Sequence, residues 1–259
     1  MPLKDRLDTL FGPFQLLWVS LWIHSVALKD ALLKDGIKAL ACPQRIRDAA
    51  VAKLLILASE NFISYEDTTP VPSLVSYASG TILELGPGPG NQIHRFDRSL
   101  VKFIYGIDPN PNFERDIAAR LEKHNLQDKY QFLACGLEDS HVLREAGITE
   151  GSMDTVLSIQ VVCSVGDPMS LMREAYSLLR PGGRFIFWEH GRSDDAFTAL
   201  AQACWNPAWS ALVGGCCINR DIKSAIVAAG EWESLDAIEQ DEDPYNFLPR
   251  TWGVLVKKV

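Results

Sequence analysis

One junction limits the fold of this chain more than any other part: a short apolar run that leads straight into a loop of alternating glycine and proline. Residues 81–93 read TILELGPGPGNQI, with the strand-like stretch at 81–85 and the loop at 86–90. Glycine directly after a buried strand lets the backbone lie close to a ligand, because no side chain stands in the way. The junction predicts an α/β domain that binds a ligand beyond the carboxyl end of its first strand.

The rest of the chain alternates between strand-like and helix-like segments, as such a domain requires. A helix is expected from about residue 91, another at 112–125, and a third that begins with Asp167 as N-cap and Pro168 in its first turn. The further strands are predicted at 101–108, 130–135, 153–162 and 184–190, with an antiparallel pair at 232–240 and 250–258. The predicted fold is a doubly wound, Rossmann-like α/β sheet of seven strands, mostly parallel, with an antiparallel C-terminal strand.

Residues 1–75 are predicted to form a helical N-terminal segment that precedes the sheet domain at 76–259. No side chain from residue 10 to residue 28 is charged, and Trp18 and Trp22 share one helical face. A membrane span needs about 20 apolar residues, and this stretch is interrupted by a Gly-Pro pair and by polar residues. We therefore expect 10–28 either to contact a membrane surface peripherally or to close over the active site as a lid.

Charge and composition exclude some functions. The chain has 259 residues, 47% of them hydrophobic and 22% charged, as in ordinary globular proteins. Its formal net charge is −8 and it contains no basic run, so we expect no nucleic-acid partner. No oligomeric state follows from the sequence.

The cysteines bear on compartment and on metals. There are six, none in a C-x-x-C pair, and Cys216 and Cys217 are adjacent. This pattern favours free thiols in a reducing compartment, and it predicts no metal site. With no secretory signal evident, we expect an intracellular protein, either cytoplasmic or attached to the cytoplasmic face of an internal membrane.

Three ligands compete for the glycine loop. A P-loop needs lysine after its last glycine, but Asn91 follows Gly90. A dinucleotide loop needs its third glycine at position 91, and the prolines remove backbone donors that a pyrophosphate requires. S-adenosylmethionine has no phosphate, and it carries an ammonium group and a sulfonium. Glu84 supplies a carboxylate for the ammonium, while Gly86 and Gly88 allow close approach, so S-adenosylmethionine is the predicted cofactor.

Polar residues at the ends of the next three strands are further candidates for the cofactor site. Asp108 is placed to accept hydrogen bonds from both ribose hydroxyls, or to cap the helix that follows. Glu138 or Asp139 is placed to meet the adenine amino group, or to form a solvated turn. Gln160 is expected near the sulfonium, unless the backbone alone satisfies it.

Over roughly residues 75–190, these motifs resemble the class I S-adenosylmethionine-dependent methyltransferases of the small-molecule type 11 group. The segments IDPNPNFE, VVCSV, LRPGGRFIFWEH and NPAW are similar to the membrane-associated alkyl thiol methyltransferases and their fungal relatives. The resemblance implies a class I methyltransferase domain at 76–259 and a small, rather hydrophobic acceptor, with a thiol favoured over oxygen or nitrogen. It also implies an N-terminal membrane anchor. The Gly-Pro-Gly-Pro-Gly loop departs from the family's more usual Cys/Thr-containing version.

Candidates for the chemistry follow the fifth strand. His190 is predicted to act as a base or to position the acceptor; the alternative is a structural histidine. Glu189 is not expected to orient it, since adjacent strand residues point to opposite faces. Trp205 and Trp209 are predicted walls of the acceptor pocket, or else ordinary helix packing. Two other functions stay open: a cyclase or isomerase that uses the cofactor's charge without consuming it, and a non-catalytic protein that binds a membrane surface.

Overall fold

The computed structural model describes residues 3–259, with side chains from residue 11 onward, and its centre is a mixed β-sheet. Over the described residues the strand order is β3-β2-β1-β4-β5-β7-β6. Strands β1 to β5 run parallel, and β7 is antiparallel to both of its neighbours. The strands are β1 (Gly80–Leu85), β2 (Val101–Ile107), β3 (Tyr130–Leu133), β4 (Met153–Ile159), β5 (Leu179–His190), β6 (Glu239–Gln240) and β7 (Arg250–Val256). The predicted seven-stranded, mostly parallel α/β sheet is confirmed.

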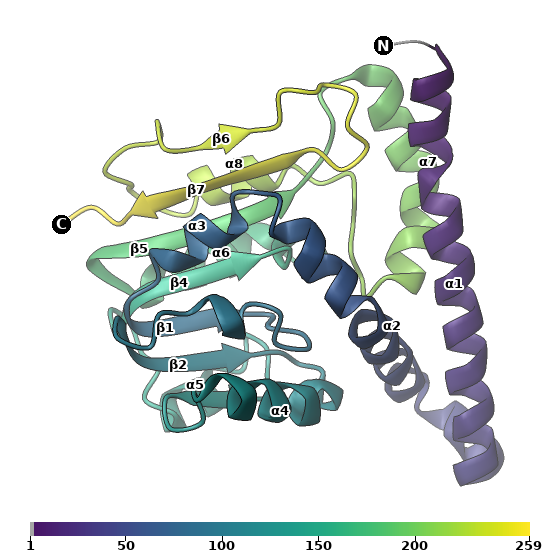
Figure 1. Cartoon of the computed structure of the whole chain (residues 1–259), viewed down its shortest axis with the longest axis horizontal. Helices are drawn as coiled ribbons and strands as arrows, with labels where there is room; N and C mark the ends of the chain where they lie inside the picture. Colours follow the sequence, from purple (N-terminus) through teal and green to yellow (C-terminus); the bar gives the residue numbers. More distant parts are fainter. Residues whose placement is uncertain (1–2) are drawn as a thin grey trace.

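Helices cover both faces of this sheet, and a helical N-terminal segment lies across the carboxyl ends of its parallel strands (Figure 1). The α-helices are α1 (Leu3–Asp35), α2 (Pro43–Glu66), α3 (Val71–Ser76), α4 (Glu114–His124), α5 (Ser140–Glu145), α6 (Pro168–Leu178), α7 (Ala196–Leu212) and α8 (Ile222–Val227). Short 3-10 turns occur at η1 (Gly36–Ala41), η2 (Ile93–Arg95), η3 (Pro111–Phe113) and η4 (Val162–Ser164).

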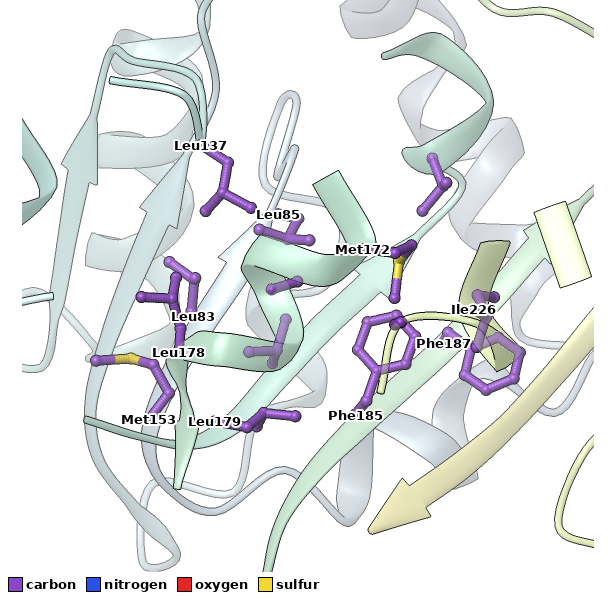
Figure 2. Packing of buried hydrophobic residues seen from close by; sticks show 14 of the residues in the cluster. Leu83, Leu85, Leu137, Met153, Met172, Leu178, Leu179, Phe185, Phe187 and Ile226 are labelled. Atoms are coloured by element: carbon purple, nitrogen blue, oxygen red, sulfur yellow. The ribbon is translucent and has the colours of Figure 1, made fainter. Parts of the chain in front are cut away.

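Alternation along β1 builds two apolar layers. Leu83 and Leu85 face the layer shown in Figure 2, where the buried side chains of α6 and α8 pack against β4 and β5. Ile82 points to the other face and packs with α3 and α4. Successive strand residues point to opposite faces. Because Ile82 and Leu83 are both apolar and buried, β1 is covered on both faces, as is usual in parallel sheets.

The predicted start of α6 is confirmed in detail. The Asp167 carboxylate accepts hydrogen bonds from the backbone N–H groups of Met169 and Ser170, and Pro168 is the first helical residue. This cap satisfies donors that the first helical turn leaves without a backbone partner.

The helix expected from residue 91 is wrong, because the chain forms only the single 3-10 turn η2 there. Glycines with positive φ keep the backbone in a non-helical loop up to Gly90. A few residues later Asp97 already closes the next turn by accepting from the Ser99 N–H. Too few residues remain before β2 for an α-helix.

The strand predicted at 232–240 is also mostly wrong. Only β6 pairs regularly with β7, and Trp232 forms an isolated bridge to Lys257. The Trp232 indole N–H donates to the Ile226 carbonyl, which draws this side chain into the core. Ser234 then closes a turn by accepting from the Asp236 N–H, so the segment leaves the sheet between the two contacts.

The N-terminal segment is two long helices packed on the sheet domain. α1 continues through Pro13 without a break and packs against α2 and α7 (Figure 1). Its inner side buries Leu17, Ser20 and Ile23, and the Ser20 hydroxyl donates to the carbonyl of Leu212 at the end of α7. The segment is therefore bound to the domain by apolar packing and by polar contacts.

Candidate active site

The three glycines after β1 have different surroundings. Gly86, Gly88 and Gly90 all have positive φ, of 53°, 53° and 83°, which side chains other than glycine's rarely tolerate. A Cβ on Gly86 would lie 2.9 Å from the methyl groups of Val161, and one on Gly90 would lie 2.6 Å from Ile93. A Cβ on Gly88 would meet nothing within 4 Å. Gly88 is therefore where a ligand can lie against the backbone, whereas Gly86 and Gly90 are explained by packing within the chain.

Asp108, which follows β2, lies against this open glycine. Its Oδ2 accepts from the Gly88 N–H at 3.3 Å, and its Oδ1 accepts from the Asn110 N–H at 2.9 Å. Burial raises the pKa of Asp108 to about 6. The alternative of a helix cap at Asp108 is wrong, since Asn110 caps η3 and the N-cap of α4 is Phe113.

Glu84 is a buried carboxylate with one oxygen free. Its Oε2 accepts from the Tyr130 hydroxyl at 2.8 Å, while Oε1 has no hydrogen-bond partner among the described residues. Burial raises its pKa to about 7, an effect that the Tyr130 hydrogen bond opposes. A buried acceptor without a donor is costly unless a ligand supplies one. The residues at this strand end therefore fit the ammonium-bearing tail of S-adenosylmethionine.

The turn after β3 carries the predicted adenine residues. Asp139 accepts from the Gly136 N–H at 2.9 Å and closes the turn. Glu138 is exposed, and its carboxyl group folds over Gly136, 2.4 Å from where a Cβ would stand. Asp139 thus has the structural role, and an adenine contact by Glu138 stays a prediction.

Gln160, the residue directly after β4, has a strained backbone conformation. Its φ of 61° lies in the left-handed region, which costs roughly 1–3 kcal/mol for a residue other than glycine. Its N–H donates to the Trp188 carbonyl at 2.9 Å, and its Nε2 donates to Glu66 at 3.2 Å. Both groups are thus engaged by the protein, and the predicted contact near the sulfonium stays a prediction.

Glu66, the last residue of α2, joins the N-terminal segment to the cofactor loops. Besides Gln160, it accepts from Gln92 Nε2 at 2.9 Å and from Arg95 Nη1 at 2.7 Å. Both of those residues lie in the short segment after the glycine loop, within or just before η2. Sequence reasoning missed Glu66, since an acidic residue at the end of an apolar helix has no distinguishing local signal.

A cavity of about 350 Å³ lies between the N-terminal helices, α7 and the segment before β7. Its walls are mostly apolar, and one of them is Tyr65, the neighbour of Glu66. It is lined by Gly12, Pro13, Leu16, Tyr65, Trp209, Asn246, Phe247, Leu248 and Arg250. Of the two predicted tryptophans, Trp209 lines the cavity, while half-buried Trp205 packs in the neighbouring apolar cluster.

Arg250 places a buried positive charge on the cavity wall. The residue is 8% exposed, and its guanidinium lies 4.3 Å from the ring centroid of Trp188. Its Nε and Nη1 have no hydrogen-bond partner within the described part of the chain. An unpaired buried cation is strongly unfavourable, so this cavity suits a ligand that brings an acceptor or a negative charge to Arg250. Sequence reasoning missed this residue.

His190 lies behind that wall. It is 3% exposed, and its Nε2 lies 3.2 Å from the Sγ of Cys216. Its Nδ1 has no hydrogen-bond partner among the described residues, and His190 is not among the residues that line the cavity. Glu189 points to the opposite face, as expected, where it accepts from Ser158. A direct role of His190 as base stays a prediction.

Comparison with known families identifies the domain that carries the predicted cofactor residues. The model of one family, described as a methyltransferase domain, matches residues 83–187, from β1 into β5. Residues 83–187 belong to the methyltransferase-domain family. The methyltransferase domain contains the glycine loop, Asp108, Glu138 and Gln160, and the chain is an S-adenosylmethionine-dependent enzyme.

Curated relatives extend the similarity beyond this domain. Human "Thiol S-methyltransferase TMT1B" is 29% identical over 182 residues, which cover 66% of this chain and 68% of the human protein. "Methyltransferase OMS1, mitochondrial" of Saccharomyces cerevisiae is 27% identical over 195 residues, covering 71% of this chain and 40% of the yeast protein. The predicted resemblance to thiol methyltransferases and fungal relatives is confirmed at this level.

Solved structures share the fold at lower identity. An O-methyltransferase family protein from Burkholderia thailandensis has a TM-score of 0.60 at 15% identity, covering 96% of this chain and 71% of that one. The [4+2]-cyclase SpnF has a TM-score of 0.56 at 14% identity, covering 75% and 81%. The fold around the methyltransferase domain therefore does not by itself choose the reaction.

Proposed function

We propose that this enzyme transfers the methyl group of S-adenosylmethionine to the sulfur of a small hydrophobic thiol bound in the cavity beside Arg250. The observation that carries the proposal is the buried Arg250 guanidinium, whose Nε and Nη1 have no hydrogen-bond partner among the described residues, on a mostly apolar wall. A thiolate satisfies both features, because its carbon skeleton contacts the apolar residues while its charge faces Arg250. The named activity of the human relative supports a thiol acceptor.

The position of the cavity supports its role as acceptor site. Tyr65 lines it and directly precedes Glu66, which binds both the glycine-loop segment and the end of β4. Arg250 lies opposite His190 in the β5–β7 register and stacks on Trp188, whose partner in β4 is Ile159. The cavity thus adjoins the strand ends that carry the proposed cofactor residues. About 350 Å³ is at the lower end of the range for small-molecule sites.

The chemistry demands little of the protein beyond alignment and a thiolate. The acceptor sulfur forms the new S–CH₃ bond as the bond from the sulfonium to that carbon breaks, which leaves S-adenosylhomocysteine. A free thiol with a pKa near 8.5 is a few per cent ionised at neutral pH. A nearby cation lowers a thiol pKa, so Arg250 increases the ionised fraction, and the proton leaves to solvent. A hydroxyl of much higher pKa gains far less from the same group.

Matched acceptors test this proposal. The full chain is incubated with labelled S-adenosylmethionine and with pairs that differ only in one atom, such as an alkyl thiol and the corresponding alcohol or amine. We expect kcat/KM for the thiol to exceed the others by about 100-fold or more, and Arg250→Gln to lower it by about 10- to 100-fold, as loss of a charge-assisted contact implies. Arg192→Gln, which alters an arginine outside the cavity lining, is the control.

Other outcomes separate the alternatives. Equal methylation of the alcohol or amine contradicts a thiol enzyme. A product that gains no methyl mass while the cofactor is conserved identifies a cyclase or isomerase. Cofactor binding with no reaction on any acceptor identifies a binding protein.

We also propose that α1 binds a membrane surface and leaves the enzyme peripherally attached to an internal membrane. The segment Phe11–Ala41 contains an 18-residue window with a mean hydropathy of 1.4, which makes it apolar and long enough to cross a membrane by length and composition. Its outer side exposes large apolar residues at helical spacing, including Phe11, Phe14, Trp18 and Trp22. Because the inner side packs on the domain, an interfacial position fits better than a span. Flotation with vesicles tests it: a full chain that stays entirely with the aqueous fraction contradicts attachment.

A further inference from the structure

Three potential metal ligands from separate segments converge behind the cavity wall. Cys163 lies in η4, His190 is the last residue of β5, and Cys216 follows α7. All three are buried, with exposures of 1%, 3% and 7%. The three side chains therefore meet in the interior of the protein and not on its surface.

The distances between their ligand atoms are those of a small coordination sphere. Cys216 Sγ lies 3.5 Å from Cys163 Sγ and 3.2 Å from His190 Nε2, and all three atoms lie within 4.8 Å of one another. A tetrahedral Zn²⁺ ion with ordinary bond lengths separates two sulfur ligands by about 3.8 Å, and a sulfur from a nitrogen ligand by about 3.6 Å. Small side-chain adjustments are enough to bring the three onto one ion.

We propose that Cys163, His190 and Cys216 form a binding site for one divalent cation of the zinc class. Two thiolates and a neutral imidazole favour zinc or a similar borderline-soft ion over magnesium or calcium, which prefer oxygen ligands. Two thiolates also neutralise the dication, so the loaded site adds no net charge to a buried region. Zinc sites with three protein ligands leave a fourth position for water or another small ligand.

The orientation of His190 agrees better with a ligand than with a proton relay. It presents Nε2 to the two sulfurs, whereas a relay needs an acceptor at Nδ1, and no described residue hydrogen-bonds to that atom. The neighbouring carboxylate, Glu189, is engaged on the other face with Ser158 and the Val161 N–H.

A cation here acts on the acceptor cavity indirectly. Trp209 packs in the same buried cluster as Cys163 and Cys216, and it also lines the cavity. An ion that joins the end of β5 to the segments after β4 and α7 therefore holds this wall in place. The inference does not depend on which acceptor the enzyme methylates.

Cobalt is the probe, because Co²⁺ in a tetrahedral thiolate site absorbs visible light. The full chain, reduced and freed of metal with a chelator, is titrated with Co²⁺ and then with Zn²⁺. We expect one Co²⁺ per chain, visible d–d bands with a sulfur-to-cobalt transition, and loss of the bands when Zn²⁺ is added. Cys163→Ser and Cys216→Ser each weaken Co²⁺ binding at least tenfold. The matched controls are Cys42→Ser and Cys204→Ser, which alter exposed thiols and keep the bands.

A further variant keeps the test decisive if the serine variants fail to fold. His190→Cys retains three ligands and raises the number of sulfurs, so the sulfur-to-cobalt transition strengthens. The proposal is overturned if the wild-type chain binds no Co²⁺ or shows octahedral spectra. It is also overturned if His190→Cys leaves the spectrum unchanged, or if the bands vanish in an exposed-cysteine control while persisting in the buried-cysteine variants.

Discussion

The backbone N–H of Gly88 donates to the carboxylate of Asp108 across 3.3 Å, although the two residues follow different strands. This hydrogen bond joins the glycine loop and the end of β2 into one continuous surface. A cofactor that lies against the open side of Gly88 therefore also meets a buried carboxylate. The contact couples the position of the loop to the ionisation of Asp108.

Asp108→Asn tests that surface. The amide keeps an oxygen for the backbone donors but loses the charge that strengthens hydrogen bonds from ribose hydroxyls. We expect S-adenosylhomocysteine to bind about 10- to 100-fold more weakly, as loss of one charge-assisted hydrogen bond implies. Titration calorimetry measures the change. Glu114→Gln, an exposed acid in the first turn of α4, serves as control; unchanged affinity in Asp108→Asn rejects the assignment.

Glu84 predicts a pH dependence of cofactor binding. Burial raises its folded-state pKa from 4.5 to about 7. Its protonated form therefore stabilises the unliganded protein at low pH, and this contribution is lost as the pH rises through about 7. An ammonium group binds the ionised form, so affinity falls below pH 7.

Dividing the cofactor affinity of the wild type by that of Glu84→Gln cancels any effect of pH on the cofactor itself. We expect the ratio of their affinities to grow about tenfold between pH 6 and pH 8, because the ionised fraction of a carboxyl with a pKa of about 7 rises from about one tenth to about nine tenths over that range. Calorimetry at the two pH values measures it. A ratio that stays constant shows that Glu84 does not meet the ammonium.

Glu66→Gln is expected to loosen the attachment of α2 to the glycine-loop segment. The variant weakens its hydrogen bonds from Gln92 and Gln160 and removes one carboxylate from Arg95, which keeps Asp67 as a partner. We expect the free energy of unfolding in urea to fall by about 1.5–3 kcal/mol, and cofactor affinity to fall with it. Glu60→Gln, whose side chain is 82% exposed, should change stability by less than about 1 kcal/mol. Equal effects in both variants count against a special role of Glu66.

The outer face of α1 predicts membrane affinity. Trp18 and Trp22 are 66% and 61% exposed. Each transfer of an indole to a lipid interface contributes about 1–2 kcal/mol, so Trp18→Ser and Trp22→Ser should each weaken vesicle binding about tenfold. Sedimentation with neutral vesicles measures it. The control is Tyr77→Ser, an exposed aromatic before the amino end of β1; a similar loss there means that exposed aromatics bind lipid without selectivity.

The parts of the fold that sequence predicts best are those coded within a few residues. The apolar alternation of β1, the cap at Asp167 and the glycine loop each depend on neighbours in the chain, and each appears where it is expected. The helix predicted from residue 91 does not form, because the glycine loop and the next turn occupy the residues that a helix would need.

The polar contacts that shape the site are of another kind. Glu66 meets partners 26 to 94 positions away, and Cys216 lies 53 positions from Cys163. Arg250 reaches Trp188 only because β7 inserts antiparallel beside β5. No spacing rule contains these pairs, so a single sequence gives no motif for them.

The helix α1 has a consequence for how this enzyme is assayed. Pro13 and Leu16 form part of the cavity wall, while Phe14 and Trp18, between and beside them in sequence, face outward. If the outward residues rest in lipid, an oily acceptor dissolved in the bilayer is already concentrated one helix-width from its binding site. The apparent KM for such an acceptor then varies with the amount of lipid or detergent in the cuvette. Kinetic constants for different acceptors become comparable only when each is expressed as a concentration in the apolar phase.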